Sequence, residues 1–230
     1  MARLLIVGPG YTASRIGAAI AARGWSVVSA GRDQTADRAA MLNEIAAATH
    51  ILSSVPPQQD RDPLLEAFGA ALAESPARWI GYLSSTGVYG DAGGAWVDEG
   101  APVGGGRRSA RAAADAAWLA LHAETRVFRL PGIYGPGRSA LDRVRQGRAH
   151  RIDLPDQVFS RVHVDDIVSG VLAARDAPAG AYNLADDRPC SQDEVVAFAA
   201  HLLGRDVPVY DGSWTEWGAQ PDTAKALGPA

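Results

Sequence analysis

A glycine-rich turn near the amino terminus is the first segment whose residue types and spacing could do chemistry. Gly8 and Gly10 open a G-x-G-x-x-A pattern, residues 8–13, directly after an aliphatic run at 3–7. Glycines in such a turn permit a sharp reversal and let backbone N–H groups approach a pyrophosphate at the start of the next helix. The pattern therefore predicts a dinucleotide-binding turn; the alternative is a tight turn that holds no ligand.

The end of the next strand is where a dinucleotide fold contacts the adenosine ribose. An acidic residue there accepts a hydrogen bond from the ribose 2′-hydroxyl, whereas an arginine accommodates a 2′-phosphate. Arg32 is the first long side chain after a strand predicted at 25–30, and its planar guanidinium suits a phosphate. The sequence therefore favours NADP over NAD. In the alternative, Arg32 is solvated and Asp33 binds the ribose.

The elements that must position these residues alternate along the chain. Apolar runs without a helical period are separated by segments whose apolar residues recur every three or four positions. The predicted strands are 3–7, 25–30, 50–55, 79–83, 126–130 and 181–184, and the predicted helices are 13–23, 37–48, 62–74, 108–122, 165–175 and 191–204. This alternation predicts an α/β fold with a doubly wound parallel sheet. Between Asp33 and His50 there is room for a helix but not for another strand.

Composition narrows the class of protein. With 230 residues, 47% of them hydrophobic, the chain predicts a single domain, 1–230, with a small C-terminal lobe from about 137 to 230. The balance of 22 basic and 26 acidic side chains argues against a nucleic-acid binder. One cysteine, Cys190, excludes an internal disulfide, and no cluster has metal-ligand spacing, so no metal is predicted. The first apolar run is too short for a signal peptide or a membrane span, which favours a cytoplasmic protein.

Longer segments carry a more specific signal. The chain resembles the extended short-chain dehydrogenases/reductases, the NAD(P)-dependent epimerase/dehydratase-like group, in motifs that follow in the group's order: 82–90 (YLSSTGVYG), 96–99 (WVDE) with Pro102, 129–138 (RLPGIYGPGR), 159–166 (FSRVHVDD) and 182–187 (YNLADD). The resemblance runs from residue 3 to about 204. It implies a Rossmann fold with a small C-terminal substrate lobe and with the dinucleotide across the carboxyl edge of the sheet.

The resemblance also implies where a cofactor and a substrate would bind. Besides Arg32, the cofactor-binding residues would be Gly8, Gly10, Tyr11, Thr12, Ser54, Val55, Pro131, Gly132 and Ile133. Ser85 matches the family's catalytic Ser/Thr position, with Thr86 beside it. Arg161 stands where many relatives hold an anionic substrate group. Relatives pair through the helices expected at 62–74 and 108–122, so a homodimer is a further expectation.

One departure from the family pattern bears on catalysis. The family's acid/base tyrosine and the lysine four residues later align with Arg107 and Arg111, and no lysine precedes Lys225. The pKa of an arginine is too high for a proton shuttle, although Arg111 could still bind the ribose. The replacement donors considered are Tyr89, Ser85 and Tyr134, with Tyr89 first. In the alternative, Tyr89 packs under its loop with the hydroxyl satisfied.

Three functions compete on these grounds. The first is an NADP-dependent oxidoreductase acting on a small carbonyl or sugar-like substrate, with Ser85, Tyr89 and Arg111 as its catalytic residues. The second is a non-catalytic NADP-binding sensor or regulatory protein that has lost the Tyr/Lys pair. The third is an epimerase or dehydratase with a tightly held cofactor, which would need acid/base groups that the sequence does not show.

Overall fold

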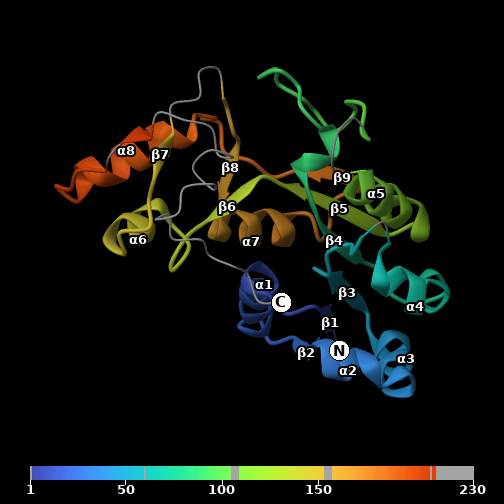
Figure 1. Ribbon diagram of the computed structural model, residues 1–230. Coiled ribbons are helices and arrows are strands. Elements are labelled where there is room, and N and C mark those ends of the chain that lie inside the picture. The colour runs from blue at the N-terminus through green and yellow to red at the C-terminus, as the bar shows by residue number, and fades with distance from the viewer. Residues whose placement is uncertain (1, 60, 105–108, 153–156, 208, 211–230) are drawn as a thin grey trace. The chain divides into compact units, whose positions relative to one another are not determined.

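The computed structural model describes residues 2–59, 61–104, 109–152, 157–207 and 209–210. Its centre is a six-stranded sheet with the strand order β2-β1-β3-β4-β5-β9 (Figure 1). Every neighbouring pair in this sheet is parallel. The strands are β1 (Arg3–Val7), β2 (Ser26–Ala30), β3 (His50–Ser53), β4 (Ile80–Ser85), β5 (Thr125–Leu130) and β9 (Gly180–Asn183). The predicted α/β class, with a Rossmann-type parallel sheet, is confirmed.

Helices cover both faces of the sheet. Successive side chains of a strand point to opposite faces, and on the central strands the side chains on both faces are mostly apolar. On β1, Leu4 and Ile6 join one buried cluster, while Leu5 and Val7 join the other. The first cluster lies under α1 (Tyr11–Ala21) and α7 (Val164–Ala173), and the second under α3 (Arg38–Ala47), α4 (Pro63–Ala73) and α5 (Ser109–Leu121).

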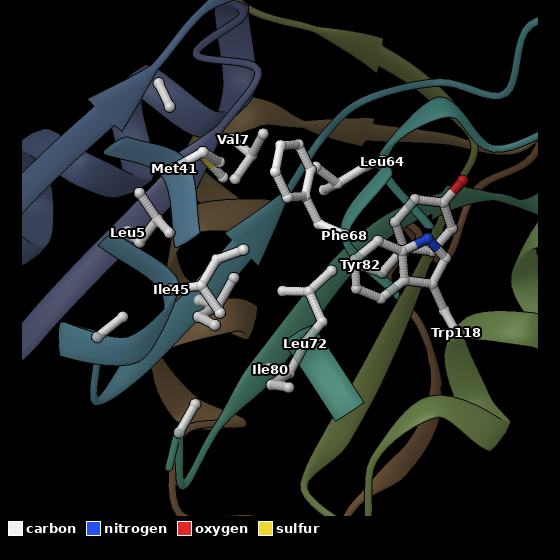
Figure 2. Packing of buried hydrophobic residues seen from close by; sticks show 14 of the residues in the cluster. Leu5, Val7, Met41, Ile45, Leu64, Phe68, Leu72, Ile80, Tyr82 and Trp118 are labelled. Atoms are coloured by element: carbon white, nitrogen blue, oxygen red, sulfur yellow. The ribbon is translucent and has the colours of Figure 1, made fainter. Parts of the chain in front are cut away.

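The second cluster fixes α4 and α5 against β4 (Figure 2). Tyr82 of β4 stacks on Trp118 of α5, with ring centroids 4.9 Å apart and planes 10° apart. The Trp118 indole N–H donates to Asp62 at 2.8 Å. The other carboxylate oxygen of Asp62 accepts the N–H groups of Leu64 and Leu65, so this one residue caps α4 and anchors α5.

The described chain forms two compact units, each considered by itself. The first comprises 1–133 and 161–186, and the second comprises 134–160 and 187–230, within the described residues of each range. In the second unit α6 (Ala140–Arg145) packs on α8 (Gln192–Leu202) around a small apolar cluster. The remaining short elements are α2 (Arg32–Ala36), η1 (Thr86–Tyr89), β6 (Gly132–Tyr134), β7 (Arg151–Ile152), β8 (Arg161–His163) and β10 (Val209–Tyr210).

Two differences from the predicted elements have local causes. The strand expected at 50–55 ends at Ser53, because Ser54 and Val55 turn to contact the glycine loop. Helix α2 was not expected, because residues 32–36 show no apolar period; the Gln34 side chain accepts the Gly31 N–H at its start, at 2.9 Å. In the described part of the chain β2 is an edge strand. This agrees with the prediction that the segment between Asp33 and His50 has no room for a further strand. None of the described helices has the length and hydropathy needed to cross a membrane.

Candidate functional site

The glycine turn after β1 is locked to the end of β3. Gly8 has φ +78°, in the left-handed region that favours glycine. A Cβ atom on Gly8 would lie 3.1 Å from Val55 Cγ2 and 3.3 Å from the Val55 backbone nitrogen. The Ser54 N–H donates to the Val7 carbonyl at 3.0 Å, and the Ser54 hydroxyl donates to the Gly8 carbonyl. Gly8, Ser54 and Val55, which the family resemblance grouped, are therefore brought together.

Gly10 has a different environment from Gly8. It is the N-cap of α1 and has an ordinary extended backbone, with no side chain to cap the helix. A Cβ atom on Gly10 would meet only the Gly8 carbonyl oxygen, 4.0 Å away. No contact within the described protein therefore requires glycine at position 10. A ligand that approached the first N–H groups of the 11-residue helix would require it, because a side chain there would stand in its way. The turn fits the pyrophosphate of a dinucleotide.

The next two residues of the turn have structural contacts. Thr12 is buried at the start of α1. The Tyr11 ring lies under the Arg15 guanidinium, 3.8 Å from ring centroid to Cζ, and Arg15 also donates to the Tyr11 carbonyl at 2.9 Å. The Tyr11 ring therefore packs against Arg15 of its own helix.

The end of β2 lies beside this turn, because the Gly8 N–H donates to the Ala30 carbonyl at 2.9 Å. Arg32 and Asp33 follow at the start of α2, and both are exposed. Neither charged group has a hydrogen bond or ion pair with another residue in the described ranges. Both remain available for the adenosine end of a dinucleotide, and the geometry does not choose between them.

The ends of β4 and β5 form the neighbouring part of the same edge. Ser85 pairs in register with Leu130, so Pro131, Gly132 and Ile133 follow directly beside it. Ser85 is half-buried, and its Oγ accepts the Gly87 N–H at 3.1 Å, which caps the 3-10 turn η1 that begins at Thr86. The hydroxyl hydrogen of Ser85 has no acceptor among the described residues. The structure thus brings the predicted Ser85, Thr86 and 131–133 together.

Tyr89, the first candidate for the acid, has its hydroxyl engaged within the protein. The side chain is 9% exposed, and its hydroxyl donates to Asn183 Oδ1 at 2.7 Å. The same oxygen accepts from Arg129 Nη1 at 2.9 Å. This geometry corresponds to the alternative of a tyrosine packed under its loop, and it argues against Tyr89 as a proton donor.

A buried polar network continues from Tyr89 through Arg129. Arg129 donates to Asp115 at 2.7 Å, and Asp115, fully buried, also accepts the Ser84 hydroxyl at 2.7 Å. Arg129 further donates to the Glu99 carbonyl at 3.2 Å. Burial alone would lower the pKa of Arg129, but its hydrogen bonds to Asp115 and Tyr89 raise that pKa above the ordinary arginine value. The network ties the loop after η1 to α5 and β5.

Asn183 and Glu99 complete this network on the β9 side. The Glu99 carboxylate accepts the Asn183 backbone N–H at 2.7 Å. The roles of Arg129, Asp115, Glu99 and Asn183 were not predicted from the sequence. The available signal was a pair of opposite charges at positions expected to be buried, Asp115 in an Ala-rich helix and Arg129 in a predicted central strand. Buried charges of this kind are usually paired.

Arg111 lies toward a different partner from the one expected. It is half-buried on α5, close to the hydroxyl of Tyr82. Burial raises the pKa of Tyr82 to about 12, and the positive charge of Arg111 opposes that rise. The Tyr82 hydroxyl nevertheless has no hydrogen bond of normal geometry among the described residues. Because Tyr82 is fully buried, this pair does not replace the missing Tyr/Lys pair at a substrate.

The remaining substrate candidate lies on β8. Arg161 is half-buried at the start of that strand, and its carbonyl accepts the Asp186 N–H at 2.7 Å. Two residues on, His163 Nδ1 accepts the Asp165 N–H at 3.3 Å and caps α7, so this pair has a structural role. Within the described ranges no group of three or more His, Cys, Asp or Glu side chains is arranged to hold a metal ion.

Comparison with known proteins places this geometry in a family. A conserved protein of unknown function from Silicibacter pomeroyi has a solved structure that matches 96% of this chain and 85% of its own, at 37% identity and a TM-score of 0.82. The chain belongs to the family of that protein. Protein YeeZ of Escherichia coli K12 is 27% identical over 253 residues, covering 93% of this chain and 88% of that protein.

More distant structures share the fold. A Thermus thermophilus UDP-glucose 4-epimerase in complex with NAD matches 91% of this chain and 86% of its own, at 21% identity and a TM-score of 0.70. Neighbours that include a dTDP-glucose 4,6-dehydratase and this epimerase, both in complex with NAD, share the fold of the chain, which is the fold that the resemblance of the motifs implied. No family model matches the chain. A 29-residue match to Arabidopsis thaliana mitochondrial thiosulfate/3-mercaptopyruvate sulfurtransferase 1 covers 8% of that protein and carries no argument.

Proposed function

We propose that the protein is an NADP-dependent oxidoreductase acting on a small carbonyl or sugar-like substrate. The observation that carries this proposal is the open space over Gly10, at the start of α1 and beside the end of β2. A glycine turn of this kind, between a parallel strand and the start of a helix, suits a pyrophosphate. Fold relatives described in complex with NAD support a nicotinamide dinucleotide.

Different residues at this edge would bind different parts of the cofactor. Gly8, Gly10 and the N–H groups of Tyr11 and Thr12 would hold the pyrophosphate, and Arg32 would pair with a 2′-phosphate. Beyond these, the ribose and nicotinamide would lie against Ser54, Val55, Pro131, Gly132 and Ile133. The bound dinucleotide supplies the hydride chemistry.

Ser85 would orient the substrate carbonyl. Its Oγ already accepts the Gly87 N–H, so its hydroxyl hydrogen is left to donate to a substrate oxygen. A donor aimed at an oxygen that gains negative charge stabilises the transition state more than the ground state. Ser85 cannot itself be the proton source at neutral pH, and Tyr89 is engaged elsewhere, so the proton would come from water through the Ser85 hydroxyl. Arg161 would pair with an anionic group of the substrate.

Replacing Ser85 tests this role. Ser85→Ala is expected to lower kcat by about 10²–10³-fold, as loss of one such donor does, while the Kd for NADPH stays the same. Ser29→Ala, at an exposed position of β2, is the matched control and should change neither value. If Ser85→Ala turned over substrate as fast as Ser29→Ala, Ser85 would have no role in the mechanism.

The second candidate function is a non-catalytic NADP-binding sensor or regulatory protein. The observation in its favour is that Tyr89, the only tyrosine between β4 and β5, is held in the Arg129 network, while the aligned Tyr and Lys positions are arginines. A titration of the apo protein with NADPH and NADH, followed by a screen of carbonyl substrates, separates the two functions. Turnover with free NADPH supports the oxidoreductase, whereas exchangeable binding without turnover supports the sensor. Absence of binding by either nucleotide overturns both.

A further inference from the structure

The opposite, amino-terminal edge of the sheet carries a second recess in the first unit. Its volume is about 320 Å³, and it is lined by Trp25, His50, Arg78, Arg175 and Asp176. Trp25 immediately precedes β2, and His50 is the first residue of β3. The glycine turn follows the other end of β1, about five residues or roughly 15 Å away along the parallel strands. The recess is therefore separate from the proposed dinucleotide site.

Aromatic rings form the inner wall of this recess. The Trp25 and His50 rings meet edge to face, with centroids 4.4 Å apart; the Trp79 ring, which lines the adjoining cleft and not the recess itself, lies 6.3 Å from His50. Behind them is a cleft of only about 20 Å³, lined by apolar side chains that include Ile20 and Val171. A planar apolar group therefore fits against the rings, because aromatic faces favour flat partners.

Positive charge dominates the outer wall. The Arg175 guanidinium lies 5.9 Å from the Trp25 ring centroid and pairs with Asp176 at 2.5 Å, so these two charges largely cancel. Arg78 is exposed and has no ion pair or hydrogen bond from its side chain in the described ranges. The Arg78 guanidinium is therefore unpaired among the described residues. A ligand carboxylate would match it, because a guanidinium and a carboxylate form two parallel hydrogen bonds. The buried Arg126 nearby already donates to the Ala177 and Glu124 carbonyls.

His50 adds a hydrogen-bond acceptor. The Thr49 hydroxyl donates its one hydrogen to the Arg3 carbonyl at 3.0 Å, so at the 2.9 Å contact His50 Nδ1 must be the donor. In the neutral ring Nε2 is then unprotonated and can accept. No partner for Nε2 occurs among the described residues, and a hydroxyl or N–H of a ligand would supply one.

We propose that this recess binds a small aromatic carboxylate, with the ring against Trp25 and His50 and the carboxylate paired with Arg78. The volume, near the lower end of the range for small-ligand sites, favours a single ring. The single unpaired cation favours a monoanion over a phosphate dianion. The proposal does not depend on dinucleotide binding, because no lining residue belongs to the glycine turn.

The test is a titration with 4-hydroxybenzoate, followed by the indole N–H signals of the protein in NMR. Shifts confined to Trp25 and Trp79, with a Kd between about 1 μM and 1 mM, are expected. Arg78→Ala should weaken binding at least about tenfold, because it removes a charge-assisted pair. 4-Hydroxybenzamide, which has the same shape without the charge, should bind as weakly to the wild type.

Arg61→Ala is the matched control, since Arg61 is also an exposed arginine but lies beside α4, in an ion pair with Glu66. It should leave the affinity for 4-hydroxybenzoate unchanged. Saturable binding that Arg78→Ala does not weaken, shifts at Trp96 in place of Trp25, or no binding at all would each overturn the proposal. The unfolding midpoint of Arg78→Ala, expected to match the wild type, shows that any loss is local.

Discussion

The candidate sites at the two edges of the central sheet are built differently. At the carboxyl edge the site is formed by backbone: a left-handed Gly8, a Gly10 with no atom close to its Cβ position, and a start of α1 that no side chain caps. At the amino edge the recess is shaped by side chains from separate segments, among them Trp25, His50 and Arg78. A backbone site needs glycines at fixed spacing and so leaves a sequence pattern. A side-chain site leaves none, because its residues meet only after folding.

The largest expected effect is at the backbone site. Gly10→Val should abolish NADPH binding, at least about 10³-fold, because its side chain would fill the pyrophosphate approach. The fold should survive, since a Cβ there meets no protein atom closer than 4.0 Å and the backbone is not left-handed. Calorimetric titration with NADPH and a thermal unfolding midpoint measure both. A folded variant that binds NADPH normally would show that the turn does not hold a dinucleotide.

The next effect tests whether side chains also brace the carboxyl edge. Asp115→Asn leaves the buried Arg129 guanidinium without its counter-charge and should lower the free energy of unfolding by about 3–5 kcal/mol. The Kd for NADPH of the folded variant should stay within a few-fold of the wild type. Glu66→Gln, which breaks the exposed pair with Arg61, should cost at most about 1 kcal/mol in the same urea titration. Equal costs for the two variants would contradict the structural role of the network.

Cofactor choice at the carboxyl edge gives a smaller effect. Arg32→Ala should weaken NADPH about 10–100-fold, through loss of a charge-assisted contact to the 2′-phosphate, and leave NADH almost unchanged. Parallel titrations with both nucleotides measure the ratio. Equal weakening of NADPH and NADH binding would mean that Arg32 does not contact the 2′-phosphate. If Asp33→Ala weakened the binding of NADH alone, Asp33 would be the residue that binds the ribose.

The smallest effect belongs to the amino edge. Burial, aided by the charges of Arg78 and Arg175, lowers the pKa of His50 to about 4, below its unfolded value of 6.5. The unfolded state therefore binds the extra proton first. The contribution to stability is complete above about pH 6.5 and is lost as the pH falls toward 4, by about 1–3 kcal/mol.

Urea unfolding between pH 4 and 7 measures this loss. His50→Gln should flatten the profile, whereas His201→Gln, at an exposed position of α8, should leave it as in the wild type. An unchanged slope in His50→Gln would assign the pH dependence to other groups.

The same contrast explains how far the sequence could go. The strands 3–7 and 126–130 were predicted almost to the residue, because each is a short, mainly apolar run without a helical period; the second ends at Pro131-Gly132 and the first at the glycine turn. Gly8 and Gly10 were recognisable for the same local reason. Tyr89 and Arg129 are 40 residues apart, and no local pattern indicates that they share a hydrogen bond. Roles that depend on such tertiary contacts, including the hydrogen bonds of the Tyr89 hydroxyl to Asn183 and Arg129, required the structure.

The last strand of the sheet has a consequence for synthesis on the ribosome. The first unit consists of residues 1–133 and 161–186, within the described residues. Strand β9, which pairs with β5, lies in the last few residues of this unit. Until Asn183 has emerged from the exit tunnel, the Tyr89 hydroxyl and the Glu99 carboxylate lack their partners from that strand. The first five strands of the sheet, β1 to β5, can pair while translation continues, but the hydrogen bonds from Tyr89 and Glu99 to β9 form late. A nascent chain stalled before residue 183 would therefore be open to proteases in the loop after η1.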